Sequence, residues 1–212
     1  MRDWLLKDLR ETLSGAKARF KTRYSDDELT RGWMISREEQ MKFKTRAPKG
    51  LKFLSHFRPP GDAVTRVTAA QIPGSDKEKV APVVVRFVDE LRRRYPNVSA
   101  STYRGHGGGS FNGKGYSLDL FITKGGRDDR GFYKPQDAVT LLRAVGEAAK
   151  AVGLEWWVLY NDFSVANVIN RETGVTRVLF VGAPTGGGKA INWHGPHPLI
   201  LHFHLDLGVA GK

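Results

Sequence analysis

The sequence predicts an α+β fold, in which a small, mostly antiparallel sheet with flanking helices follows a basic helical N-terminal extension. Three observations support this. The chain has 212 residues, enough for one domain plus an extension. Its hydrophobic period is helical in two segments of the domain, from Pro82 to about Arg94 and from Pro135 to about Val152, and is two in the segments predicted to be strands. The expected order is helices, two strands, one helix and three strands, which is typical of an α+β domain. We place the extension at residues 1–75 and the domain at 76–212.

Two capping boxes predict short helices in the extension. Ser25 and Ser36 are each followed three residues later by a glutamate. In the domain, Pro82 is suited to the first turn of a helix running to about Arg94. Pro135 opens another, which runs to about Val152.

Five segments predict strands, namely residues 98–104, 116–122, 155–160, 177–182 and 199–207. In residues 116–122, alternation places Tyr116, Leu118, Leu120 and Ile122 on one face of the strand. Ser117, Asp119 and Phe121 fall on the other face. A glycine-rich loop, residues 105–115, connects the first two strands.

Composition excludes several classes of protein and site. The chain has no cysteine, which excludes disulfides, thiolate nucleophiles and cysteine-ligated zinc. No apolar run approaches the roughly 20 residues of a membrane-spanning helix. The first residues mix charges into the apolar positions, unlike a signal peptide. We therefore expect synthesis in the cytoplasm, with delivery to the periplasm or exterior as one alternative.

Positive charge is concentrated in the first half of the chain. Residues 1–104 hold 23 Lys and Arg against 13 Asp and Glu, whereas residues 105–212 hold 11 against 9. A basic face attracts polyanions such as peptidoglycan, another anionic envelope polymer or nucleic acid. A solvated, solubilising surface is the alternative interpretation.

The last predicted strand carries two histidines on one face. Apolar residues alternate there with His202, His204 and Asp206, which therefore share a face. Two imidazoles in such a strand indicate a metal or acid–base site, with an incidental solvated face as the alternative.

Asp119 is the second candidate. A carboxylate within an apolar strand needs a partner, because an unpaired buried charge costs several kcal/mol. The partner is either an arginine such as Arg104 or a metal shared with His202 or His204. The metal alternative predicts that Asp119 and the two histidines lie on adjacent strands and converge.

Three segments that contain or adjoin these residues resemble, in the same order, the motifs of a known family. The segment SFNGKGYSLDL at residues 110–120 resembles the S-x-H-x-x-G-x-A-x-D-L motif of the LAS metallopeptidases. That superfamily includes lysostaphin-type endopeptidases, D-Ala-D-Ala carboxypeptidases and the hedgehog signalling fold. GLEWW at 153–157 and LHFHL at 201–205 are similar to the family's later G-L-E-W-G-G and H-F-E segments. The resemblance covers about residues 80–207.

The resemblance implies a zinc site with two histidines, one aspartate and a water. Asp119 matches the aspartate ligand. In an H-F-E alignment His202 is the ligand and His204 replaces the glutamate. In the family's H-x-H form His204 is the ligand and His202 is the catalytic base or transition-state stabiliser. We prefer the second alignment, because it gives both imidazoles a role.

The chain departs from the family at the first ligand. Asn112 stands where the family has histidine, and an amide oxygen is a poor zinc ligand beside imidazole. Either His106 replaces that ligand, or the site holds a different ion, or it holds no metal. Asn112 is itself a candidate catalytic residue, which would position substrate or water at the site.

The resemblance thus implies a zinc-dependent peptidase or amidase acting on cell-wall peptidoglycan peptides, as an effector or lysis protein. Residues 156–170 and 194–207 also resemble domains attached to phage-tail-like injection systems, which would make it a delivered effector. The alternatives are a nucleic-acid-binding or nuclease domain, and a non-catalytic binding module on a decayed peptidase fold.

Overall fold

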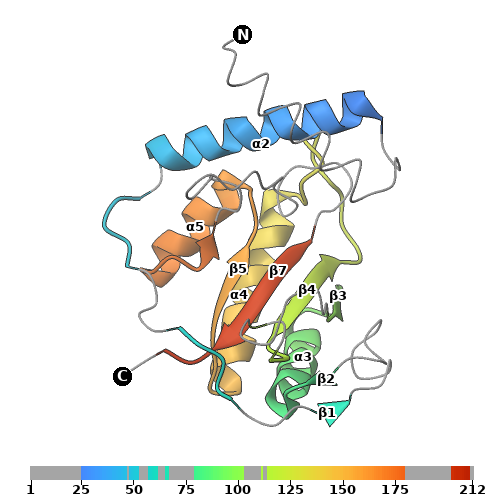
Figure 1. The fold of residues 1–212 in the computed structure, drawn as a ribbon, viewed down its shortest axis with the longest axis vertical. Helices are drawn as coiled ribbons and strands as arrows, with labels where there is room; N and C mark the ends of the chain where they lie inside the picture. Colours follow the sequence, from blue (N-terminus) through green and yellow to red (C-terminus); the bar gives the residue numbers. More distant parts are fainter. Residues whose placement is uncertain are drawn as a thin grey trace.

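Figure 1 shows the computed structural model of the chain. The structure describes residues 25–46, 48–52, 57–61, 65–66, 79–102, 111, 114–179 and 202–210. Within these ranges, helices accompany a five-stranded, mostly antiparallel sheet. The predicted α+β class is therefore confirmed.

Two helices follow the sequence prediction closely. Helix α3 spans Pro82–Arg94 and helix α4 spans Pro135–Ala151, each with its proline in the first turn. A proline fits there because its missing N–H would have no partner within the helix. The apolar stripe of each helix is buried, which fixes its orientation on the sheet. None of the helices in the described part of the chain is long and apolar enough to cross a membrane.

Helix α2 corrects the prediction of two short helices in the extension. It spans Asp26–Arg46 and begins directly after Ser25, the first predicted cap. It continues through Ser36 without interruption. A capping-box sequence is also compatible with a helix interior, and no proline separates the two boxes to end the first helix.

Helix α5, Phe163–Thr173, was not predicted. The side chain of Asp162 accepts hydrogen bonds from the backbone N–H groups of Ser164 and Val165, an N-cap interaction. Gly174 ends the helix in the left-handed conformation, with φ of 69°. Both signals are present in the sequence.

The five-stranded sheet has the order β3-β4-β7-β5-β6. Its strands are β3 (Val98–Ser101), β4 (Ser117–Ile122), β5 (Glu155–Leu159), β6 (Val178–Leu179) and β7 (Phe203–Gly208). The pairs are antiparallel except β5–β6, whose strands are parallel and connected through α5. Two short strands, β1 (Thr65–Arg66) and β2 (Lys79–Val80), form a separate antiparallel pair. The last strand in the sequence, β7, is therefore the central strand of the sheet.

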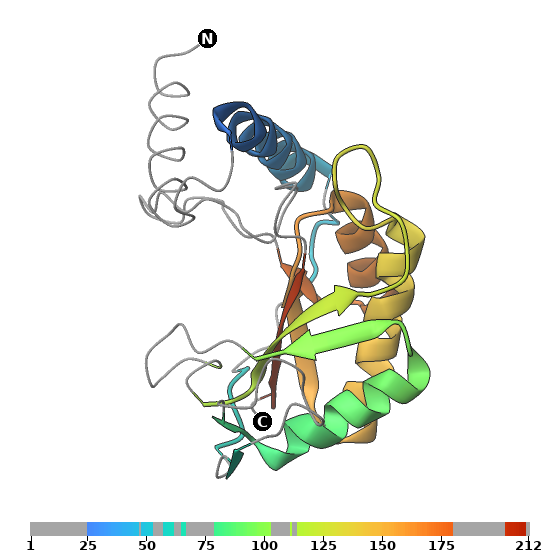
Figure 2. The same cartoon turned by 90° about the vertical axis from the view of Figure 1, so that its right-hand side faces the viewer.

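Helices α3, α4 and α5 cover one face of this sheet (Figure 2). Alternation along the strands directs the apolar side chains of β4, β5 and β7 into the core against these helices. Trp156 of β5 belongs to this core, whereas Trp157 belongs to the other face, as alternation predicts. That other face, called the second face below, carries the polar residues of β4 and β7.

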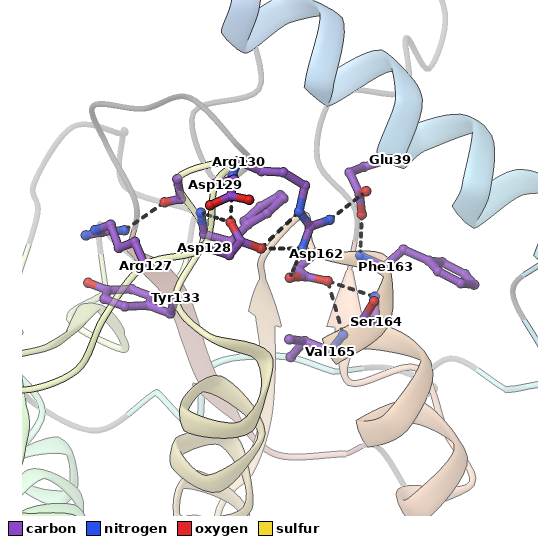
Figure 3. Close-up of polar contacts among 12 residues, drawn as sticks. Glu39, Arg127, Asp128, Asp129, Arg130, Tyr133, Asp162, Phe163, Ser164 and Val165 are labelled. Atoms are coloured by element: carbon purple, nitrogen blue, oxygen red, sulfur yellow. Dashed lines mark hydrogen bonds and ion pairs between the residues drawn. The ribbon is translucent and has the colours of Figure 1, made fainter.

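Helix α2 is joined to the domain by a buried ion-pair network (Figure 3). Glu39 is 1% exposed and accepts hydrogen bonds from Arg130 Nη1 and from the backbone N–H of Phe163, each at 2.9 Å. Arg130 also contacts Asp162 at 3.1 Å and Asp128 at 2.6 Å. The network links α2, the loop before α4 and the beginning of α5.

Candidate functional site

The register of β4 against β7 brings the candidate residues together. Asp119 pairs directly with His204, and Ser117 pairs with Asp206. On the other side of β7, Trp157 of β5 is the partner of Asp206. Because direct cross-strand neighbours project from the same face, these side chains meet on the second face.

The side chains form a continuous chain of contacts along β7. Asp119 Oδ1 lies 3.5 Å from His202 Nε2 and 3.0 Å from His204 Nδ1. The other ring nitrogen of His204, Nε2, lies 3.5 Å from Asp206 Oδ1. The four side chains are between 9% and 17% exposed, so they are largely desolvated.

Asp206 is the most firmly held carboxylate of the group. Its Oδ2 accepts a hydrogen bond of 2.7 Å from the indole Nε1 of Trp157. Its Oδ1 accepts a hydrogen bond from the Ser117 hydroxyl. Both donors come from the strands that flank β7, so the sheet itself fixes the position of this carboxylate.

The two carboxylates determine the charge of His204. Burial acts to lower the pKa of this imidazole, but hydrogen bonds to Asp119 and Asp206 outweigh it and raise the pKa to about 9. Without a bound ion, His204 is therefore an imidazolium at neutral pH. An arriving cation would have to displace that proton from the nitrogen that it binds.

An aromatic group adjoins the polar chain. The ring of Phe57 stacks on Phe111 at 4.8 Å and contacts Trp157 at 4.5 Å, measured between ring centroids. Gly208 leaves room for the segment of Phe57 and Arg58 to lie against β7. A Cβ at this position would lie 2.6 Å from the carbonyl oxygen of Arg58 and 2.7 Å from the Phe57 ring. His202 packs against Phe121 at the other end of the polar chain, with centroids 5.6 Å apart.

The donor types in the cluster suit zinc, which binds imidazole nitrogen and carboxylate oxygen. Two ligands of a tetrahedral zinc ion lie about 3.3 Å apart, given bonds of about 2.0–2.1 Å. The separations of 3.0 Å and 3.5 Å from Asp119 Oδ1 to the two histidines bracket this value. The donor types suit the ion, and the 3.0 Å separation is equally that of the hydrogen bond between Asp119 and His204.

Among the described residues, no group of three or more His, Asp or Glu side chains is disposed to hold a metal ion. The resemblance described above predicts only two ligands from this part of the chain, Asp119 and one histidine. Asn112 and His106, the candidates for the remaining ligand, lie outside the described residues.

The structure thus brings together Asp119, His202 and His204 on adjacent strands, which is the arrangement expected in the metal alternative. Their roles as metal ligands or acid–base groups stay predictions. Arg104, the alternative partner of Asp119, also lies outside the described residues.

Two members of the cluster had no role in the sequence interpretation. Asp206 was placed on the histidine face, two residues from His204, but it was given no part in the site. Ser117 was placed on the face of Asp119 without any partner. Alternation gives the face of a residue, whereas its neighbour depends on the register between β4 and β7, which the sequence does not encode locally.

Part of the predicted basic surface, including the basic residues among 1–24, falls outside the described residues. Helix α2, which is described, is balanced, with five basic and five acidic side chains. It contributes no net positive charge to a polyanion-binding face.

Comparison with models of protein families, with curated proteins and with solved structures finds no match for this chain.

Proposed function

We propose that the protein is a metal-dependent hydrolase, a peptidase or amidase that acts on the peptides of bacterial cell-wall peptidoglycan. The observation that carries this proposal is the convergence of Asp119 with His202 and His204 across β4 and β7. The substrate class rests on the resemblance of three ordered segments to the LAS metallopeptidases.

In this proposal Asp119 and His204 hold a zinc ion together with a ligand from the 105–115 loop. Zinc in such a site polarises a carbonyl group and lowers the pKa of a bound water. His202, on the other side of Asp119, serves as the acid–base group that accepts and returns a proton. The low exposure of the cluster strengthens each of these electrostatic interactions.

Digestion of purified peptidoglycan by the full chain tests this function. We expect soluble peptides or newly freed amino groups, detected by mass spectrometry, to appear with zinc and to disappear with a chelator. Asp119→Asn should abolish the release. Glu155→Gln should not, since Glu155 lies on β5 and pairs with Arg177 outside the cluster. Absence of release under every condition would contradict the proposal.

A non-catalytic binding module is the second candidate, favoured by one observation. The hydrogen bonds of Asp119 and Asp206 raise the pKa of His204, so an imidazolium can pair with these carboxylates without a metal ion. Peptidoglycan binding that persists in chelator, without any product, would support this candidate. Degradation of DNA or RNA in parallel reactions would instead support a nuclease.

A further inference from the structure

The ring of His204 lies between two carboxylates, with Nδ1 towards Asp119 and Nε2 towards Asp206. We propose that Asp206 is a positioning residue that orients His204, so that Nδ1 is the nitrogen offered to the metal. This inference rests on the proposed function and adds to it a residue, Asp206, and the ring nitrogen through which His204 would bind.

The chemistry of metal-bound histidine supports this arrangement. A histidine that binds a metal through one ring nitrogen almost always donates the N–H of the other to a carboxylate, a carbonyl or water. That second contact fixes both the tautomer and the orientation of the ring. In this chain the carboxylate of Asp206 occupies the required position, 3.5 Å from Nε2.

Asp206 is suited to the role because it is itself immobilised. Trp157 holds one of its oxygens and Ser117 holds the other, from opposite sides of β7. Its side chain is only 11% exposed, so water has little access to these contacts. The ring of His204 therefore faces an acceptor whose position is set by three strands.

Replacing Asp206 with asparagine tests the assignment with little change in shape. The amide oxygen is required to accept the Trp157 N–H, so the amide NH₂ then faces His204. An NH₂ group donates to Nε2 and forces the remaining ring proton onto Nδ1. That proton occupies the lone pair that the metal needs.

The primary measurement is the zinc affinity of the full chain, obtained by competition with a chromophoric chelator. We expect Asp206→Asn to weaken zinc binding by about 10–100-fold, the usual effect of losing such a partner. Glu155→Gln is the matched control and should retain the wild-type affinity, because it removes a carboxylate of the same sheet that pairs with Arg177. A folded Asp206→Asn protein with wild-type affinity would overturn the inference while leaving the proposed function intact.

A second measurement uses the wild-type protein and does not depend on the variant folding. In the zinc-saturated protein, long-range ¹H–¹⁵N spectra should show His204 protonated at Nε2 and metal-bound at Nδ1. A purely structural role for Asp206 would not produce this signature. A spectrum in which the zinc-bound ring is that of His202 would overturn the assignment. Wild-type protein that binds no zinc would remove both the proposed function and this inference.

Discussion

Replacing Glu39 with alanine should destabilise the protein by about 3 kcal/mol. Glu39 is almost fully buried, and its two oxygens accept hydrogen bonds from Arg130, from Lys42 and from the backbone N–H of Phe163. Hydrogen bonds to charged groups are worth about 1.5–3 kcal/mol each, and alanine removes those of Arg130 and Phe163. It also removes the contact with Lys42, which is more exposed and keeps Glu38 as a partner. The Phe163 N–H, at the beginning of α5, loses its carboxylate acceptor.

The expected loss lies at the lower end of that sum for two reasons. Arg130 keeps its contacts with Asp128 and Asp162 after the substitution. The pKa of Asp162 is raised, first by burial and also by the nearby charge of Glu39, despite the opposing effect of Arg130. Removing Glu39 relieves that repulsion and returns part of the stability.

Urea unfolding at pH 7 measures this effect, and the neighbouring glutamate supplies a matched control. Glu38 is 63% exposed and forms its ion pair with Lys42, so Glu38→Ala should cost less than about 1 kcal/mol. A Glu39→Ala loss no larger than that of Glu38→Ala would refute the reasoning. It would mean that the network of Figure 3 does not attach α2 to the domain.

Two further predictions concern the site itself. Because the pKa of His204 is raised from 6.5 to about 9, its protonation stabilises the metal-free fold by about 3 kcal/mol below pH 6.5. That contribution is lost as the pH rises through 9, so the urea concentration at the unfolding midpoint, measured in the presence of a chelator, should fall between pH 6.5 and pH 9. A midpoint that does not change with pH, or one that falls equally in the His204→Asn variant, would contradict this prediction. Gly208→Ala should lower the melting temperature and cost about 1–3 kcal/mol, because the new methyl group meets the carbonyl of Arg58 and the ring of Phe57. An unchanged melting temperature would show that this segment shifts without cost.

Local patterns in the sequence predicted a large part of the fold. Pro82 and Pro135 marked two helix starts, and their apolar stripes are buried as expected. Alternation in the strands of Asp119 and His204 correctly assigned these residues to one face. Such features repeat within one element, so a single sequence is enough to reveal them.

Other features depend on contacts between distant parts of the chain. Helix α5 had local signals, in Asp162 and Gly174, but its short apolar stripe was not distinguished from a loop. Glu39 and Arg130 are 91 residues apart, and no pattern around either residue indicates that they meet. The contact of Ser117 with Asp206 likewise depends on the register between β4 and β7.

The metal content of the purified full chain tests the proposed function most directly. After loading with zinc and removal of unbound ion, elemental analysis should find one zinc per wild-type chain. Asp119→Asn should retain far less, because it loses the carboxylate that lies against both histidines. Wild-type protein without zinc, or an Asp119→Asn variant that retains as much as the wild type, would contradict a metal site at this cluster.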